Sequence, residues 1–146
     1  MAEDHLTLDK QICFPLYAAS RLVIRLYQPL LAPLGLTYLQ YIVMMILWEH
    51  GALPVTAIGE HALLDTGTLS PLLKRLEQQG FVARRRSAKD ERVVEIAPTK
   101  EGLTLKKHCA EIPKHLFERV GLPLDEAKAL KKHIDHLLTQ LVESDA

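Results

Sequence analysis

A single cysteine precedes all of the tyrosines in this chain, and the two residue types together could form a reactive thiol site. Cys13 lies in the stretch QICFPLYAASR, near the start of a helix-like run. The tyrosines that follow it are Tyr17, Tyr27, Tyr38 and Tyr41. A helix N-terminus stabilises a thiolate through its dipole and free N–H groups, and phenolic hydroxyls can donate hydrogen bonds to the charged sulfur. The same residue types are also common as inert core packing, so their chemistry alone leaves both interpretations open.

A second set of residues, in the middle of the chain, could bind nucleic acid. Residues 64–92 contain seven basic and four acidic side chains, a net charge of +3 in a chain whose formal net charge is zero. Small hydroxyl residues at a helix start suit close approach to the major groove, and basic residues on a hairpin suit the DNA backbone or the minor groove. The alternative is a solvated basic surface. The candidate contacts are Thr66, Thr68, Ser70, Lys74, Arg75, Arg86, Lys89 and Arg92.

The elements that must position these residues follow from hydrophobic spacing, caps and turn residues. Apolar positions repeat at intervals of three and four near the N-terminus, which predicts a first helix over about 15–32. Thr37 with Gln40, and Asp65 further on, are typical helix caps. We expect further helices over 37–50, 56–63 and 65–80, a short extended piece near 53–55, strands over 81–86 and 92–97, a helix over 99–119 kinked at Pro113, and a last helix over 125–143.

This order predicts a mainly α fold with a small β-hairpin, in a winged helix-turn-helix arrangement. The chain, 1–146, is expected to be one domain, with the winged helix-turn-helix over about 37–98 and dimerisation helices over about 9–34 and 99–143. The first and last helices carry apolar stripes that a compact winged domain does not need. Pairing these stripes across a two-fold axis would bury them, so we expect a homodimer. The C-terminal stripe is Leu130, Ile134, Leu137, Leu138 and Leu141.

Composition limits the cellular setting and the cofactors. The longest apolar run, YIVMMILW, is too short to span a bilayer, and the acidic N-terminus is unlike a signal peptide. We therefore expect a cytoplasmic protein with no membrane partner, in which Cys13 and Cys109 are reduced thiols. Two cysteines without CxxC spacing, and histidines without HExxH spacing, predict no metal site, and we expect no cofactor.

The stretch LDTGTLSPLLKRLEQQGFVARRRSAKDERVVEIAPTKEG resembles the recognition helix and wing of MarR-type transcription regulators, including their Asp-x-Arg wing signature at Asp90 and Arg92. Together with QICFPLYAASR and YQPLLAPLGLTYLQYIVMMILWEH, it is similar to the organic-hydroperoxide-sensing branch of that family. The resemblance implies that Cys13 is the peroxide sensor and that Tyr27 and Tyr38 hydrogen-bond its thiolate. It also implies a pseudo-palindromic, double-stranded DNA operator as the partner.

The role of the second cysteine stays open at this stage. Some members of that branch resolve the oxidised sensor with another cysteine in the C-terminal helical region, near the position of RVGLP in this chain. Cys109 lies earlier, in KKHCAEIPKH, so it is either a resolving thiol or an ordinary helical cysteine. In the second case a low-molecular-weight thiol would resolve the sensor.

The sequence therefore predicts a repressor, not an enzyme, that holds operator DNA when reduced and releases it after an organic hydroperoxide oxidises Cys13. One alternative is a MarR-type regulator that binds a small apolar or phenolic ligand in the same cleft, with Cys13 incidental. Another is a thiol peroxidase. Against the peroxidase, no arginine or threonine pattern beside Cys13 would bind a peroxide oxygen.

Overall fold

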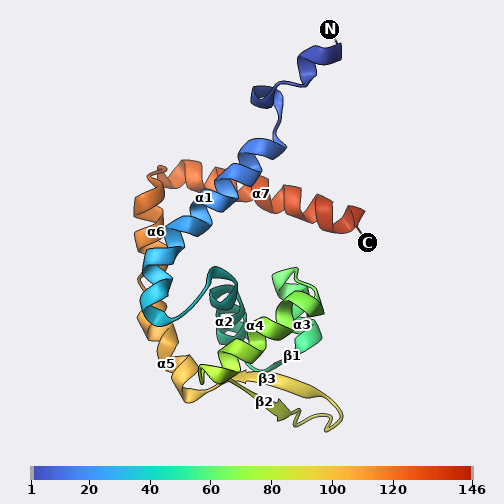
Figure 1. Ribbon diagram of the computed structural model, residues 1–146, viewed down its shortest axis with the longest axis vertical. Coiled ribbons are helices and arrows are strands. Elements are labelled where there is room, and N and C mark those ends of the chain that lie inside the picture. The colour runs from blue at the N-terminus through green and yellow to red at the C-terminus, as the bar shows by residue number, and fades with distance from the viewer. Residues whose placement is uncertain (1, 146) are drawn as a thin grey trace. The chain divides into compact units, whose positions relative to one another are not determined.

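Helices dominate the computed structural model, which describes residues 2–145, and one small sheet lies among them (Figure 1). The helices are α1 (Cys13–Leu31), α2 (Tyr38–His50), α3 (Val55–Ala62), α4 (Thr66–Gln78), α5 (Lys100–Cys109), α6 (Ile112–Val120) and α7 (Leu124–Ser144). The strands are β1 (Leu53–Pro54), β2 (Val82–Arg86) and β3 (Val94–Pro98), and 3₁₀ turns cover Ala2–His5, Leu8–Lys10 and Ala32–Leu34. The predicted mainly α fold with a β-hairpin is confirmed.

The chain divides into two compact units, one ending at Ile112 and the other beginning at Pro113. The first unit holds α1 to α5 and the sheet, and the second holds α7 and nearly all of α6. The predicted limits of the winged region, 37–98, and of the dimerisation regions, 9–34 and 99–143, stay predictions.

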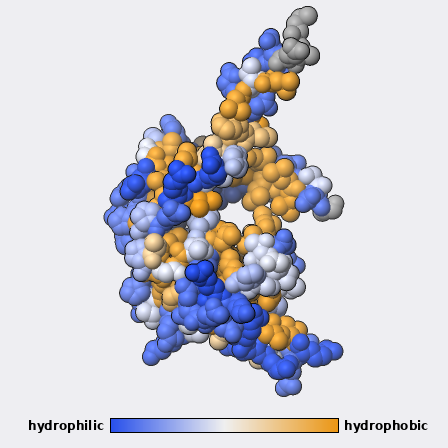
Figure 2. Space-filling model, in the orientation of Figure 1, coloured by the Kyte–Doolittle hydropathy of each residue, from blue (hydrophilic) through white to orange (hydrophobic). Residues whose placement is uncertain are grey.

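The first helix begins at Cys13, slightly before the predicted start. Pro15 lies in its first turn, where the missing N–H removes no intrahelical hydrogen bond. Apolar side chains around this end are exposed, including Ile12 at 78% and Phe14 at 44% (Figure 2). No single helix within residues 2–145 is long and apolar enough to cross a membrane. The segments Cys13–Leu34 and Tyr38–His50 reach the required length and apolar character only when they are taken together, and the chain bends by 74° between them.

The second helix forms the centre of the first unit's core. Its residues Val43, Met44 and Leu47 are at most 1% exposed, and they belong to one cluster with the buried leucines of α4. The helix starts at the predicted capping box. The Gln40 backbone N–H donates to Thr37 Oγ1 at 3.3 Å, and the Thr37 N–H donates to Gln40 Oε1 at 2.9 Å. This box holds the turn that precedes α2 against the helix's own first turn.

The helix-turn-helix consists of α3 and α4, which lie side by side in Figure 1. Gly59 permits their connection, because a Cβ there would lie 2.8 Å from the Leu64 carbonyl oxygen. Asp65 caps the start of α4, as predicted, and its carboxylate accepts from the Thr68 N–H at 2.7 Å. Pro71 lies inside α4 without ending it, although it lacks the N–H that would donate to the carbonyl of Gly67.

The sheet joins the predicted extended piece near 53–55, which forms β1, to the predicted hairpin. Its order is β1-β3-β2, with all neighbours antiparallel, and Leu53 of β1 pairs with Ile96 of β3. Val82 and Ile96 are at most 2% exposed and anchor the base of the hairpin in the core. The β2–β3 hairpin extends outward from this base as the wing (Figure 1).

The predicted helix over 99–119 is wrong, because two helices occupy that range. The fifth helix ends at Cys109 and α6 begins at Ile112, with Pro113 in the first turn of α6. In one continuous helix the Pro113 ring would clash with the carbonyl of residue 109, so the chain breaks rather than kinks. The last helix is confirmed, and no residue of α7 is buried.

Candidate functional site

The fourth helix presents a polar face opposite its buried leucines. Leu69, Leu73 and Leu76 are at most 1% exposed, which fixes the rotation of α4 about its axis. All five candidate contacts on this helix are exposed; they are Thr66, Thr68, Ser70, Lys74 and Arg75. Thr66, Ser70 and Lys74 follow at intervals of four, so they form one row along the helix surface. A row of small hydroxyls followed by a lysine suits insertion of the helix N-terminus into a groove.

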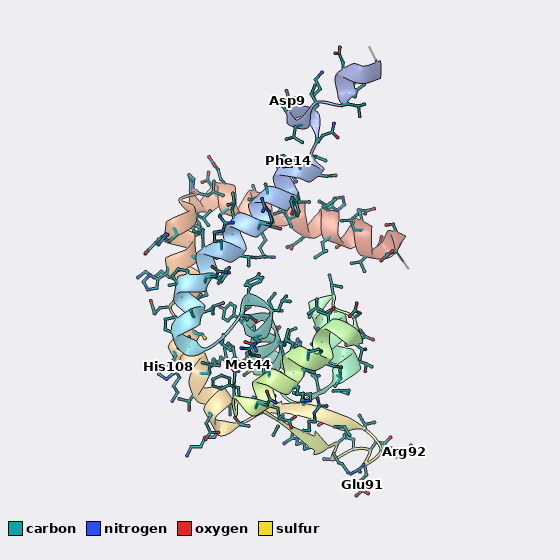
Figure 3. The ribbon with its side chains drawn as sticks, in the orientation of Figure 1. Asp9, Phe14, Met44, Glu91, Arg92 and His108 are labelled. Atoms are coloured by element: carbon teal, nitrogen blue, oxygen red, sulfur yellow. The ribbon has the colours of Figure 1, made fainter. Side chains whose placement is uncertain are left out.

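The wing tip holds one arginine in a defined orientation. Arg92 donates from Nε to Asp90 Oδ1 at 3.1 Å and from Nη2 to Asp90 Oδ2 at 3.3 Å. These bonds lower the pKa of Asp90, and the side chain of Arg92 stays 90% exposed at the tip (Figure 3). Arg86 lies below the tip and donates to the Glu91 carbonyl at 2.8 Å. The site prediction named Arg92 but gave no role to Asp90, although the Asp-x-Arg spacing was the available signal.

The other basic residues of this region differ in their pairing. Arg84 is paired with Glu77 at 2.9 Å and Arg85 with Glu95 at 3.9 Å. Lys74, Arg75 and Lys89 are exposed and make no ion pair within residues 2–145. Figure 2 shows a largely hydrophilic surface over α4 and the wing. The uncompensated positive charge therefore gathers on the helix and wing surfaces that the sequence predicted to contact DNA.

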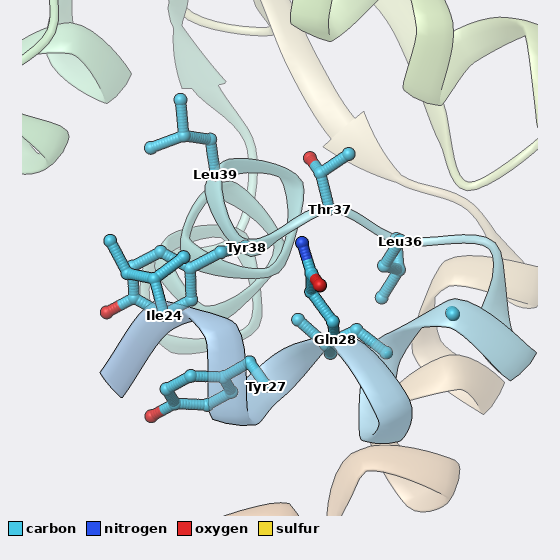
Figure 4. A pocket seen from close by; sticks show the side chains of 9 residues that line it. Ile24, Tyr27, Gln28, Leu36, Thr37, Tyr38 and Leu39 are labelled. Atoms are coloured by element: carbon cyan, nitrogen blue, oxygen red, sulfur yellow. The ribbon is translucent and has the colours of Figure 1, made fainter. Parts of the chain in front are cut away.

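A cavity of about 800 Å³ opens between α1 and the start of α2. Tyr27 and Tyr38 line it side by side, with ring centroids 4.7 Å apart and both hydroxyls on the same side (Figure 4). The rest of the lining is largely apolar and was not predicted from the sequence; it consists of Ile24, Gln28, Leu31, Ala32, Leu36, Thr37 and Leu39. A largely apolar space that is lined by two tyrosines is suited to a small organic molecule.

Burial moves the titration of both cavity tyrosines further above neutral pH. Desolvation, together with the neighbouring Tyr38 and Tyr41, raises the pKa of Tyr27 to about 12. Desolvation also raises the pKa of Tyr38 above its ordinary value. Both hydroxyls are therefore neutral near pH 7 and can donate a hydrogen bond to an anion in the cavity.

Cys13 is exposed and lies far from this cavity in its own chain. Cys13 and Tyr27 are fourteen residues apart on α1, which is about 21 Å along a continuous helix. The structure thus brings Tyr27 and Tyr38 together and leaves the predicted sensor thiol apart from both.

Cys109 lies on the inner side of α5 and is 4% exposed. Burial raises the pKa of its thiol. The pKa of the Tyr41 hydroxyl is raised mainly by desolvation, and the nearby Cys109 thiol is the second cause. Tyr41 in turn packs against Tyr27, with ring centroids 5.7 Å apart. Cys109 is therefore a core residue behind the tyrosine cluster.

Comparison with known proteins gives one consistent group. The MarR family model matches residues 36–94. The organic hydroperoxide resistance transcriptional regulator of Bacillus subtilis is 44% identical over 138 residues, which is 94% of both chains. Reduced AbfR bound to DNA is similar with a TM-score of 0.76 and 35% identity, and overoxidised AbfR bound to DNA with a TM-score of 0.72 and 34% identity. AbfR is a Staphylococcus epidermidis protein, and each of these alignments covers 97% of this chain and 99% of AbfR.

Proposed function

The chain belongs to the MarR family of transcription regulators, and we propose that it is a repressor that senses organic hydroperoxides through Cys13. Membership confirms the winged helix-turn-helix arrangement and identifies a DNA-binding regulator rather than an enzyme. The observation that carries the proposal is an exposed thiol at the start of α1 in a chain that also has an apolar cavity with two tyrosine hydroxyls. The Bacillus subtilis relative, a regulator of organic hydroperoxide resistance, supports the effector class.

The sensor site is assembled from two copies of the chain. About 21 Å of helix separates Cys13 from Tyr27, so the thiol cannot reach Tyr27 of its own chain or Tyr38, which packs against Tyr27. In a two-fold dimer, the start of α1 from one copy can enter the cavity of the other. The exposed side chains of Ile12 and Phe14 would then be buried next to the cavity's apolar lining. The homodimer is therefore part of the sensing mechanism.

The chemistry begins with the Cys13 thiolate, which accepts hydrogen bonds from the neutral hydroxyls of Tyr27 and Tyr38 of the other copy. The sulfur attacks the terminal oxygen of the hydroperoxide, so an S–O bond forms as the O–O bond breaks. The products are a Cys13 sulfenic acid and an alkoxide, which takes a proton from solvent to become the alcohol. The apolar lining accommodates the organic group and favours an organic hydroperoxide over hydrogen peroxide.

A low-molecular-weight thiol then condenses with the sulfenic acid, forming a mixed disulfide and releasing water. Cys109 is a poor resolving thiol because it is 4% exposed and burial raises its pKa, which lowers the fraction of reactive thiolate. The mixed disulfide is bulky and uncharged, so it cannot keep the hydrogen bonds of a thiolate. A sulfinate keeps a negative charge and acceptor oxygens. AbfR is bound to DNA in its overoxidised form, which supports added bulk as the cause of release.

On DNA, α4 enters the major groove with the row of Thr66, Ser70 and Lys74, and Arg92 at the wing tip contacts the backbone or minor groove. A dimer on a pseudo-palindromic operator must place two recognition helices about 34 Å apart. A mixed disulfide displaces α1 of one copy against the cavity of the other, which changes this spacing and releases the operator. Operator binding and the use of a reducing thiol place the protein in the cytoplasm.

A gel-shift titration with cumene hydroperoxide, in the presence of a low-molecular-weight thiol, tests the proposal. Cys13→Ser keeps the size of the side chain but cannot form a sulfenic acid, so it should bind the operator as the parent does and ignore the peroxide. Cys109→Ser is the matched control and should release DNA as the parent does. A Cys13→Ser protein that leaves its DNA as readily as the parent would refute the sensor role.

A second candidate function is favoured by the cavity itself. Its volume of about 800 Å³, its apolar lining and its two hydroxyls also suit a small apolar or phenolic effector, with Cys13 incidental. The Cys13→Ser protein separates the two functions. Release of its operator by a phenolic compound, combined with parental sensitivity to peroxide, would establish the ligand-binding regulator in place of the thiol sensor.

A further inference from the structure

Two side-chain amides connect the turn that carries Tyr38 to the end of the recognition helix. Gln79 caps α4 at its C-terminal end. Its Nε2 donates to the Gly35 carbonyl oxygen at 2.6 Å, and its Oε1 accepts from Gln40 Nε2 at 3.4 Å. Gln40 Oε1 in turn accepts from the Thr37 backbone N–H at 2.9 Å. One orientation of each amide satisfies all three bonds, so donors and acceptors alternate through a continuous relay.

The relay has a buried end at Gln40 and an exposed end at Gln79, and the burial of Gln40 makes its hydrogen bonds costly to interrupt. Gln40 is 2% exposed, and no buried side-chain nitrogen or oxygen within the described residues lacks a hydrogen-bond partner. If the Gln79 amide moves away, the buried Gln40 amide nitrogen loses the acceptor that the structure gives it. An unpaired buried donor is destabilising, so the two glutamines should move together. Gly35 allows the Gln79 amide to approach its carbonyl closely, because a Cβ at this position would lie 3.3 Å from Gln79 Nε2. Its φ of +72° also favours glycine.

The two ends of the relay lie at the two functional surfaces. The turn at residues 36–39 forms one wall of the cavity, where Leu36, Thr37, Tyr38 and Leu39 all contribute (Figure 4). The other end is α4, because the Gln79 backbone N–H also donates to the carbonyl of Arg75. Arg75 and its neighbour Lys74 belong to the candidate DNA surface. The relay therefore joins cavity and DNA surface through hydrogen bonds within one compact unit.

We propose that Gln79 is a positioning residue that transmits the state of the sensor cavity to the recognition helix. The inference rests on the proposed function. A mixed disulfide in the cavity displaces Tyr38, and the capping box makes Thr37 and Gln40 move with it. The amide bond from Gln40 to Gln79 then shifts the C-terminal end of α4. Gln79 acts in this way without touching either the peroxide or the DNA.

Gln79→Glu is the primary test, because a carboxylate still accepts from Gln40 but cannot donate to Gly35. Gln78→Glu is the matched control. It adds the same charge one residue earlier, and the Gln78 side chain makes no hydrogen bond within residues 2–145. For each protein, operator affinity is measured for the reduced dimer and for the dimer with a mixed disulfide at Cys13. The ratio of the two affinities is the coupling, and mass spectrometry reports the modification of Cys13.

All three proteins should acquire the mixed disulfide at the same rate. The affinity ratio of Gln79→Glu should be at least about fivefold smaller than that of the parent, and that of Gln78→Glu should equal the parent's. A merely structural role would lower the melting temperature and leave the ratio unchanged, which would overturn the inference. Equal loss of coupling in both variants would assign the effect to charge and overturn it as well.

The parent protein separates this inference from the function on which it rests. A parent that is not modified at Cys13, or is modified and keeps its operator, refutes the proposed function, and the relay's role falls with it. If Gln79→Glu does not fold, Gln79→Met keeps the length of the side chain and removes both hydrogen bonds, with Gln78→Met as its control. Parental coupling in Gln79→Met would overturn the inference.

Discussion

Complementary defects placed on different copies should restore a sensor site that is shared across the dimer. One copy carries Cys13→Ser and keeps its tyrosines. The other keeps Cys13 and carries Tyr27→Phe with Tyr38→Phe. A site formed between copies then pairs the intact thiol with intact tyrosines, whereas a site within one chain would pair that thiol with phenylalanines only.

The expected difference in rate follows from the two hydroxyls. A hydrogen bond to a charged group contributes about 1.5 kcal/mol, so losing two disfavours the thiolate by about 3 kcal/mol, roughly a hundredfold in the ratio of thiolate to thiol. A more basic thiolate is also more nucleophilic. This gain offsets about half of the loss when both are expressed as logarithms of the rate. Oxidation of the double tyrosine variant should therefore be about tenfold slower than that of the parent. The rings, 4.7 Å apart, still pack as phenylalanines, so the fold should be unchanged.

The assay follows the formation of the Cys13 sulfenic acid by trapping and mass spectrometry, with dimers purified through a different tag on each copy. The parent gives the fast rate and the homodimer of the double tyrosine variant gives the slow one. The mixed dimer should oxidise its one Cys13 at the parental rate. If it oxidises at the slow rate, the thiol and the tyrosines belong to the same chain and the geometric argument from α1 is wrong.

Three further predictions address DNA binding, association and alkaline stability. Arg92→Ala should weaken operator binding and lower the salt dependence of log K by about one unit per copy; an unchanged slope in a filter-binding titration would remove the wing tip from the interface. Replacing Ile134 and Leu137 with lysine should dissociate the dimer, because charge would enter an apolar seam, and sedimentation that still gives the parental state would place the interface elsewhere. Since burial raises the pKa of Tyr27 from 10.0 to about 12, the unfolded chain loses this proton at lower pH than the folded one. The stability that the protonated Tyr27 contributes is complete below pH 10 and is lost as the pH rises towards 12. Between these pH values the melting temperature of Tyr27→Phe should therefore fall less steeply than that of the parent. Tyr17→Phe is the control at an exposed site and should behave as the parent does.

The parts of the fold that depend on local side-chain chemistry could be predicted from the sequence. Thr37 with Gln40, and Asp65, cap α2 and α4 at the predicted residues, because each cap needs only groups a few positions away. The wing was predictable for a similar reason, since a polar turn between two β-rich segments pairs neighbours in the chain.

Features that depend on distant contacts could not be predicted in the same way. The pairing of β1 with β3 joins Leu53 to Ile96 across the whole helix-turn-helix. The relay joins Gln40 to Gln79. The capping pattern singled out Gln40, but nothing in the local sequence predicts that its amide also binds a side chain 39 residues away. The break before α6 is different, because Pro113 was visible in the sequence. A kink was expected, yet a proline beyond the first turn can also end a helix outright, and pattern alone does not separate these outcomes.

The separation of the thiol from its tyrosines was present in the sequence, because a spacing of fourteen residues on one helix is already a distance of about 21 Å. Two independent observations favour the proposed site between two copies. The proposed chemistry is incomplete within one chain, since Cys13 is exposed while Tyr27 and Tyr38 line a separate, largely apolar cavity. The energetics are also incomplete, since Ile12 and Phe14 beside that thiol lie on the surface of the single chain. In the proposed dimer, a second copy that covers Ile12 and Phe14 would also bring the thiol to the cavity, so oxidation of Cys13 would disturb a contact between the two copies.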